Sequence, residues 1–247
     1  FRSDAVARLI GIEFRKVRVR KGIYCNGKFV QPDIRVANLY AQKVLGQGRL
    51  RGDRSIWNLD AVDRYIAPDN LYEQLLDAVG DRVQWGTNAD FSSLGSSCVS
   101  TAPLPVVLGL LGIDHHIEFR RAKINVRRWR LKGADVFQTI YYPHPGTNLY
   151  RVSITGDILI AEISGDFFDD YDLDVIEQSF GISLDGAEDL GAVEQKYGKI
   201  EPIDSEIRNA LLFSITHQHG IYSLGRFATW RNILLDDVVD DIAVIKR

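Results

Sequence analysis

The residues best suited to chemistry lie near the end of the chain, where a glycine and an arginine follow a short apolar segment. Residues 221–224 are typical of a buried strand, and Gly225 and Arg226 come directly after it. A glycine lets the backbone approach a ligand closely, and a guanidinium group suits a phosphate or an electron-rich ring. Asp236 and Asp237 then open a predicted helix, whose first N–H groups attract anionic or carbonyl oxygens. The pattern indicates either a ligand site or a plain strand–turn–helix whose acids complement the helix dipole.

Other polar residues give weaker signals. His217 and His219 form a His-x-His pattern without a nearby acid or cysteine, so we expect no metal and interpret them as a complement to a helix C-terminus. The acidic run 166–174 lacks the central glycine and terminal glutamate of a calcium loop, which favours a solvated acidic loop. Cys98 is expected to be a core thiol, and two cysteines make no disulfide framework, which favours a cytoplasmic location.

The elements that must position the Gly-Arg pair follow from turn signals and apolar spacing. Asn26-Gly27 predicts a hairpin over 16–30, and apolar spacing predicts helices over 35–45 and 70–80, the second capped by Asn70. Short strands are expected at 82–85 and 97–101. Residues 164–190 are expected to hold helical pieces, and further helices to cover 204–220 and the end of the chain.

The sequence in the middle of the chain predicts an antiparallel sheet. Residues 119–163 are rich in β-prone residues, and Gly156-Asp157 suits a two-residue II′ hairpin turn. Tyr141, Tyr142 and Tyr150 lie on this sheet, where they either line a substrate face or pack. The order of helices and strands predicts an α/β protein with an interrupted nucleotide-binding domain and a sheet-based second domain.

Three segments carry a resemblance to a known superfamily. Residues from Gly225-Arg226 through Asp236 to the following Val-Val resemble the C-terminal flavin-contacting motif of UDP-galactopyranose mutases and related amine-oxidase-like flavoproteins. The segment 100–105 (Ser-Thr-Ala-Pro-Leu-Pro) resembles the place where the chain leaves the flavin domain. The helix 70–80 with the segment 82–84 resembles the helix and strand whose valine touches the adenine. Together these segments cover about a third of the chain, in the expected order.

The resemblance implies a FAD cofactor and a division of the chain into two domains. It implies a FAD/NAD(P)-binding, Rossmann-like domain at 1–110 and 200–247, interrupted by a mixed or antiparallel sheet substrate domain at 111–199. The implied reaction is that of a FAD-dependent oxidoreductase on a small polar substrate, either an amine or nucleotide-linked. The alternatives are a mutase-like sugar isomerase and a non-catalytic binding or structural protein on the same scaffold. The implied catalytic residue is Arg226, and the implied cofactor contacts are Val83, Thr101, Gly225, Arg226, Asp236 and Asp237.

The sequence departs from that superfamily in two places. No Gly-x-Gly-x-x-Gly segment for a pyrophosphate occurs, and Phe1-Arg2-Ser3 resembles the residues that follow the first βαβ unit. Trp230-Arg231-Asn232 stands where the mutases carry an aromatic-Lys-Tyr cluster. The chain begins with Phe1 and contains no Met, which we interpret as a fragment, a processed chain or a sequence from which modified Met residues were dropped.

Composition and charge exclude several classes of protein. With 45% hydrophobic and 26% charged residues the chain is ordinary globular protein, and no apolar run reaches the roughly 18 residues of a membrane span. Residues 1–50 hold eleven Lys and Arg against three acids, whereas residues 156–206 hold fifteen acids against two lysines. The basic part could meet the phosphate of a nucleotide or a nucleic acid, or the basic and acidic regions could face each other or solvent. The Arg/Lys cluster at 120–132 could bind nucleic acid, and a solvent-facing strand edge protected by charge explains it as well.

Overall fold

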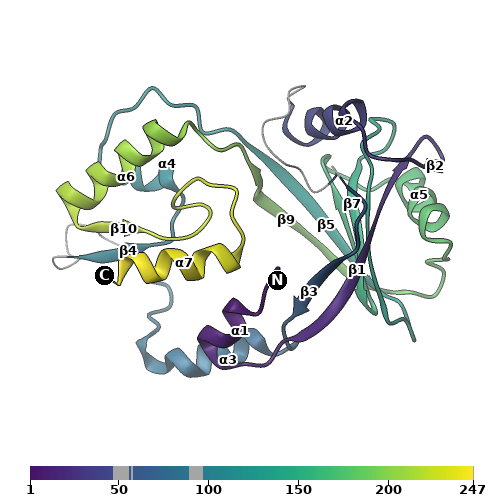
Figure 1. Ribbon diagram of the computed structural model, residues 1–247, viewed down its shortest axis with the longest axis horizontal. Helices are drawn as coiled ribbons and strands as arrows, with labels where there is room; N and C mark the ends of the chain where they lie inside the picture. Colours follow the sequence, from purple (N-terminus) through teal and green to yellow (C-terminus); the bar gives the residue numbers. More distant parts are fainter. Residues whose placement is uncertain (47–55, 57, 89–96, 247) are drawn as a thin grey trace. The chain divides into compact units, whose positions relative to one another are not determined.

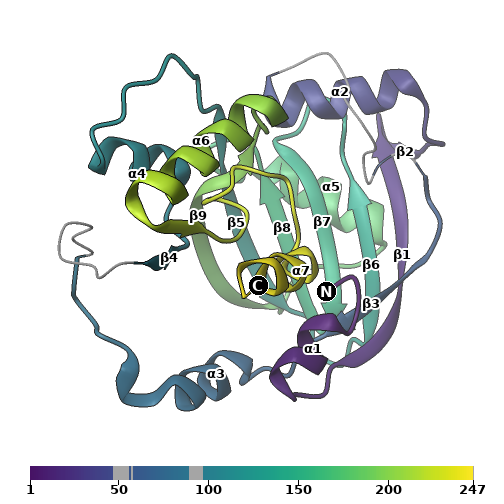
Figure 2. The ribbon, with the colours of Figure 1, turned by 60° about the vertical axis from the view of Figure 1, so that its left-hand side comes forward.

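The computed structural model describes residues 1–46, 56, 58–88 and 97–246 (Figures 1 and 2). The chain divides into two compact units. Unit 1 comprises residues 1–17, 64–119 and 201–247, and unit 2 comprises residues 18–63 and 120–200. The domain boundaries inferred above concern cofactor and substrate binding, and they remain a prediction.

Most of a mixed sheet belongs to unit 2, whereas residues 15–17 of β1 and 64–66 of β3 belong to unit 1. The described strands of this sheet have the order β2-β1-β6-β7-β8-β5-β9, with β3 also paired to β1. Strand β1 runs parallel to β6, and the other neighbours along the order are antiparallel (Figure 2). The strands are β1 (Arg15–Cys25), β2 (Lys28–Phe29), β3 (Val62–Ile66), β5 (Arg121–Arg130), β6 (Val136–Tyr141), β7 (Leu149–Gly156), β8 (Ile158–Ile163) and β9 (Glu188–Ile200).

Both predicted hairpin turns are confirmed. Asn26 and Gly27 connect β1 to β2 with φ of 53° and 73°, the left-handed backbone that a type I′ turn requires. Gly156 has φ of 66° and leads into Asp157 between β7 and β8, where Thr155 pairs with Ile158. These positive φ values belong to residues that tolerate them, which is why the local sequence sufficed.

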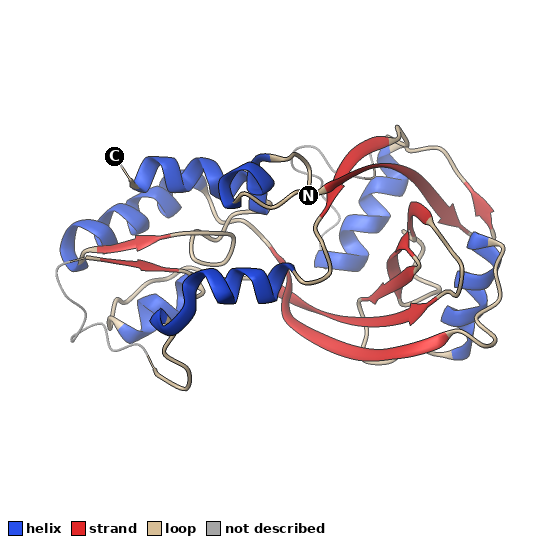
Figure 3. Ribbon diagram, turned by 90° about the horizontal axis from the view of Figure 1, so that it is seen from below, coloured by secondary structure: helices blue, strands red, loops and turns tan. Residues whose placement is uncertain are grey.

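Each face of the sheet in unit 2 is covered by one helix (Figure 3). Helix α2 (Ile34–Leu45) packs on the face that carries Tyr141 and Tyr150, and α5 (Asp170–Phe180) packs on the face that carries Tyr142. Successive strand residues point to opposite faces, so Tyr141 and Tyr142 belong to different cores. The predicted helix 35–45 is confirmed, and its first turn is capped by Asp33, whose side chain accepts the Val36 N–H at 2.7 Å.

Unit 1 holds the other helices and a small parallel pair of strands. The helices are α1 (Ala5–Ile10), α3 (Leu71–Val79), the 3₁₀ turn η1 (Gly80–Arg82), α4 (Leu104–Leu110), α6 (Ser205–His219) and α7 (Leu235–Ile245). Strand β4 (Cys98–Ser100) pairs in parallel with β10 (Ile221–Ser223). The predicted strands at 97–101 and 221–224 and the predicted helices over 70–80, over 204–220 and at the chain end are confirmed.

Some local predictions are wrong, each for a physical reason. Residues 82–85 form no strand, because the chain leaves α3 through η1 and no described strand pairs with it. Asn70 does not cap α3; its side-chain oxygen instead accepts the Gln74 amide at 2.7 Å. The acidic run is not simply solvated, because Asp172 is fully buried at the start of α5, where it caps the helix together with Asp169.

Elements that the sequence analysis did not anticipate include α1, α4, β3 and β9. Helix α4 forms because Pro103 and Pro105 occupy positions at the helix start, where a missing N–H costs nothing. Within the described part of the chain, no helix combines the length and apolar character needed to cross a membrane.

Candidate functional site

Gly225 begins a sharp turn directly after the parallel strand pair of unit 1. Ser223 lies opposite Ser100, and the Leu224 N–H donates to the Ser100 carbonyl at 2.9 Å, which extends the pairing by one residue. Gly225 follows with φ of +90°, and a Cβ built on it would meet no heavy atom within 4 Å. The turn therefore requires glycine for its backbone conformation and leaves open space beside it.

The residues after Gly225 are fixed by hydrogen bonds within the turn. Both the N–H and the hydroxyl of Thr229 donate to the Gly225 carbonyl, at 3.0 and 2.7 Å. The Arg226 guanidinium carbon lies 5.2 Å from the centroid of the Phe227 ring. The Arg226 carbonyl accepts the Arg231 N–H at 3.1 Å, which closes the turn. Arg226 thus starts a rigid turn.

Trp230 and Arg231 have structural contacts within unit 1. Trp230 is fully buried, and its indole N–H donates to the Glu201 carbonyl at 2.8 Å. Arg231 forms an ion pair with Asp241 on α7 and donates to the Thr229 hydroxyl at 3.0 Å. These contacts tie the turn to the helix that follows it.

The N-terminus of α7 is joined to the start of the chain. One oxygen of Asp236 accepts the Ser3 N–H at 2.8 Å and the Ser3 hydroxyl at 2.6 Å, and the other accepts the Arg2 N–H at 2.9 Å. Burial raises the pKa of Asp236, but these hydrogen bonds outweigh it and hold that pKa below its ordinary value. Asp237 accepts the Leu234 N–H at 2.8 Å and forms an ion pair with Arg2.

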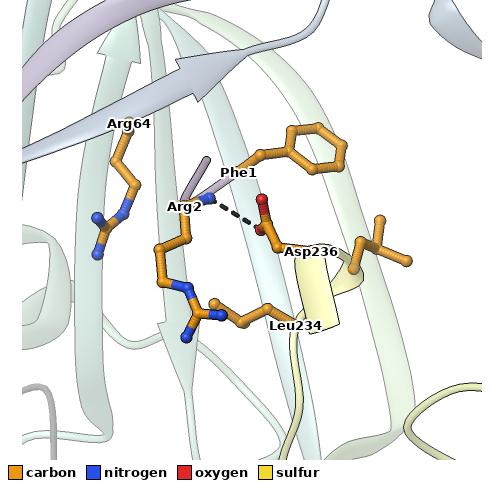
Figure 4. Close-up of a pocket in the computed structure, with 6 residues that line it drawn as sticks. Phe1, Arg2, Arg64, Leu234 and Asp236 are labelled. Atoms are coloured by element: carbon orange, nitrogen blue, oxygen red, sulfur yellow. Dashed lines mark hydrogen bonds between the residues drawn. The ribbon is translucent and has the colours of Figure 1, made fainter. Parts of the chain in front are cut away.

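A cavity of about 330 Å³ lies beside this junction in unit 1 (Figure 4). Its volume is near the lower end of the roughly 300–1,000 Å³ of small-molecule sites. Two arginines, two leucines, an aspartate and a phenylalanine form its wall: Phe1, Arg2, Arg64, Leu234, Leu235 and Asp236.

The structure brings some of the predicted site residues together and leaves others apart. Asp236 and Asp237 share the first turn of α7, and Asp236 lines the cavity. Gly225 and Arg226 form the turn after β10. Val83 follows η1 and is half-buried, and Thr101 is exposed after β4. Their contacts with a cofactor remain predictions.

The sequence reasoning did not find Arg2, Ser3 and Arg64 as site residues. Arg64 lies on β3, and more than sixty positions separate it from Arg2. The sequence signal that could have placed Arg64 on a strand is the β-prone pattern Val-Asp-Arg-Tyr-Ile of β3.

The tyrosines of unit 2 pack instead of facing an open site. Tyr141 stacks edge-on to Tyr40 at 5.6 Å, and the Tyr142 hydroxyl lies 2.6 Å from that of Ser179. Tyr150 donates to Glu162 at 2.7 Å. Burial raises the pKa of Tyr142 and of Tyr150 well above the ordinary value. The packing interpretation therefore holds for all three.

Glu162 is the centre of a buried charge network. Its carboxylate forms a two-point ion pair with Arg151 and accepts the Tyr150 hydroxyl. Burial raises the pKa of Glu162, but Arg151 and Tyr150 outweigh it, and that pKa lies below its usual range. The network satisfies a charge that would otherwise be costly inside a protein.

Lys43 is a half-buried cation of unit 2. Its ammonium group donates to the carbonyls of Tyr142 at 3.0 Å, His144 at 2.7 Å and Leu149. Burial lowers the pKa of Lys43 to about 7, and the Asp172 carboxylate opposes this shift. These hydrogen bonds hold α2 against the connection between β6 and β7.

The described side chains form no cluster suited to a metal ion, and Lys123, Arg127 and Arg130 of β5 form ion pairs. Among the residues that the structure describes, no group of three or more His, Cys, Asp or Glu could hold a metal ion. His217 and His219 lie in the last turn of α6. Basic residues of β5 pair with acids, such as Arg127 with Asp189 of β9 at 2.7 Å. A role in nucleic-acid binding remains untested.

Comparisons with known proteins identify the fold. No protein-family model and no curated protein matches the sequence. A crystal structure of reduced UDP-galactopyranose mutase matches with a TM-score of 0.68 and 14% identity, over 98% of this chain and 80% of that one. The chain has the fold of UDP-galactopyranose mutase. The predicted α/β class, with a mixed parallel and antiparallel sheet, is thereby confirmed.

Two other solved structures are less similar. RebC soaked with chromopyrrolic acid, with bound 7-carboxy-K252c, matches with a TM-score of 0.38 and 12% identity, over 87% of this chain and 42% of that one. A protein from Pyrococcus furiosus matches with a TM-score of 0.31 and 10% identity, over 58% and 38%. Of the three, the mutase is the one whose score shows a shared fold.

Proposed function

We propose that this protein is a FAD-dependent enzyme of the amine-oxidase-like superfamily that acts on a small polar substrate. The observation that carries the proposal is the mutase fold over 98% of the chain. Residues 225–237, whose sequence resembles the flavin-contacting motif, form a turn and the start of α7 directly after strand β10, which supports the proposal.

The residues of unit 1 fit the ring end of a flavin. The open space beside Gly225 would admit a planar ring close to the backbone, and Arg226 would supply a cation next to it. The fit does not extend to the pyrophosphate, since no Gly-x-Gly-x-x-Gly segment occurs in this sequence. The proposal therefore concerns the ring, and no pyrophosphate contact is assigned.

Each predicted site residue receives a role in this proposal. Arg226 lies beside the flavin or a substrate phosphate, and Val83 contacts the adenine. Thr101 lies where the chain leaves the flavin domain. Asp236 and Asp237 hold the N-terminus of α7 against residues 2 and 3, which orients its first turn.

Two reaction classes are compatible with this assignment. A bound flavin supplies a hydride acceptor or, when reduced, a nucleophile. The first class is an oxidoreductase that acts on an amine or a nucleotide-linked substrate. The second is a sugar isomerase, and the specific observation in its favour is that the matching structure is a mutase in its reduced form.

The experiment that tests flavin binding is an absorbance spectrum of the purified protein from 300 to 550 nm, followed by titration with FAD. We expect flavin bands that weaken in Arg226→Gln and persist in Arg128→Gln, an exposed arginine of β5. A colourless protein that ignores added FAD, although circular dichroism shows it folded, would refute the proposal.

A second assay separates the two reaction classes. An oxidoreductase would bleach its flavin anaerobically with a substrate amine and consume oxygen in air. An isomerase would interconvert UDP-galactopyranose and UDP-galactofuranose only after reduction with dithionite, without net consumption of reductant.

A further inference from the structure

The connection between β10 and α7 (Figure 1) contains a continuous series of polar contacts. The Arg231 guanidinium forms an ion pair with Asp241 on α7, and its Nε–H donates to the Thr229 hydroxyl at 3.0 Å. The Thr229 hydroxyl donates to the Gly225 carbonyl at 2.7 Å. We call these four residues the polar chain, which runs in the order Asp241, Arg231, Thr229 and Gly225.

The chemistry of the side chains fixes the direction of each hydrogen bond in the polar chain. A guanidinium group carries donors and no acceptor, so the Thr229 hydroxyl must accept from Arg231. The hydroxyl hydrogen is then available to an acceptor, and the Gly225 carbonyl is that acceptor. A hydroxyl that accepts from a charged donor is polarised, which strengthens its own donation. The ion pair with Asp241 therefore supports the bond to Gly225.

The Gly225 carbonyl is held by two donors of one buried residue. Thr229 is 4% exposed, and its N–H and hydroxyl donate to this carbonyl at 3.0 and 2.7 Å. The two lone pairs of the oxygen are thus both engaged. A glycine accepts several backbone conformations, so Gly225 by itself does not set the orientation of the peptide that follows it. Thr229 sets it, and the carbonyl is directed at a buried side chain.

The same peptide determines how Arg226 leaves the strand. A peptide unit is planar, so the Gly225 carbonyl and the Arg226 nitrogen and Cα share one plane. The Arg226 carbonyl accepts the Arg231 N–H at 3.1 Å, which adds a second contact between this arginine and the polar chain. The polar chain therefore acts on both residues that the proposed function places beside the flavin ring.

We propose that Thr229, Arg231 and Asp241 are positioning residues of the flavin site. They keep the Gly225 carbonyl, which is the negative end of its peptide dipole, turned away from the ring, and they hold Arg226 in the orientation that the ring requires. Charge placed near the ring tunes the electronics of a bound flavin. The inference rests on the proposed function and extends it to three residues that have no role in it so far.

The first experiment removes the Thr229 hydroxyl. Thr229→Val keeps the branched side chain but frees the Gly225 carbonyl, which could then turn towards the ring. We expect FAD binding, measured by fluorescence titration, to weaken about tenfold or more. The reduction potential of the bound flavin should fall, because a carbonyl oxygen near the ring disfavours added electrons. Thr229→Ser keeps the hydroxyl and should restore both values.

A matched control separates positioning from stability. The Thr216 hydroxyl of α6 donates to the Ile221 carbonyl at 3.0 Å, which is the same kind of bond in the same unit. Thr216→Val should lower the melting temperature about as much as Thr229→Val and leave the FAD affinity and the reduction potential unchanged. Equal effects of the two variants on the flavin would overturn the proposal. Circular dichroism verifies that both variants are folded.

A double variant tests whether the residues act as one chain. Asp241→Asn lies at the other end of the polar chain and should weaken FAD binding in the wild-type background. It should have no further effect in the Thr229→Val background, because the contact with Gly225 is already lost. Additive effects of the two substitutions would refute action through Arg231. If Thr229→Val fails to fold, Asp241→Asn with the Thr216→Val control is the test, with the same expected contrast.

The proposed function and the positioning role fail in different ways. A folded wild-type protein that binds no FAD refutes the proposed function, and the positioning role is refuted with it. A yellow wild-type protein whose Thr229→Val variant keeps its FAD affinity and reduction potential retains the proposed function and refutes the positioning role.

Discussion

Asp236 accepts both the N–H and the hydroxyl of Ser3, at 2.8 and 2.6 Å, although 233 positions separate the two residues. This contact holds the first residues of the chain against the start of α7 inside unit 1. It is also the reason that the cavity has a wall made from both segments.

Replacing Asp236 should destabilise the protein in a pH-dependent manner. We expect Asp236→Asn to cost about 2 kcal/mol of unfolding free energy at pH 7, since hydrogen bonds to a charged group contribute roughly 1.5–3 kcal/mol. The folded pKa of Asp236 is depressed, so its contribution is present above the ordinary Asp pKa of about 3.9 and is lost as the pH falls through the folded pKa. Urea unfolding at pH 7, 5 and 3 measures this difference, and a loss that stays equal at pH 3 would contradict it.

Lys43→Met should destabilise unit 2. The methionine keeps the apolar stem, but the three carbonyls of Tyr142, His144 and Leu149 lose their donor. Leaving buried carbonyls unsatisfied costs about 1–3 kcal/mol for each group, so we expect a loss of about 3 kcal/mol. Lys28→Met, on the exposed strand β2, is the matched control, and equal melting temperatures of the two variants would refute the role of Lys43.

Arg151→Met should lower the free energy of unfolding more than a double variant that removes both charges of the ion pair. The substitution leaves Glu162 buried beside Tyr150 without its cation, a situation that costs about 3–5 kcal/mol. The double variant Arg151→Met with Glu162→Gln removes the uncompensated charge and should recover part of this loss. The folded pKa of Glu162 is depressed in the wild type, so the stabilisation by this pair should decline below the ordinary Glu pKa of about 4.3. Chemical unfolding of the three proteins tests the order.

Gly225→Ala should cost stability through the backbone alone. Gly225 has φ of +90°, and its neighbourhood has room for a methyl group, so the expected loss of about 1–3 kcal/mol comes from conformation and not from a clash. Gly109 lies in α4, also with room for a methyl group but without a positive φ. Gly109→Ala should therefore stabilise by up to about 1 kcal/mol, and opposite signs in a thermal melt would verify the contrast.

Local features were predictable because their causes lie within a few residues. Asn26-Gly27 and Gly156-Asp157 specified their hairpins, since only a few residue types tolerate a positive φ. Helix α6 was predictable from Asp204, which caps its first turn, and from Gly220, which ends it in the left-handed conformation. The strand β9 was missed, because most of its residues are exposed and it carries no apolar alternation.

The sequence by itself therefore determined the turns, most helices and the α/β class, and it drew attention to residues 225–237. Tertiary structure alone decided that Asp172 is buried and that Arg2, Arg64 and Asp236 border one cavity. The physical reason is that turn and helix signals depend on backbone sterics between neighbours. The cavity depends on hydrogen bonds and packing between segments that meet only when the chain has folded.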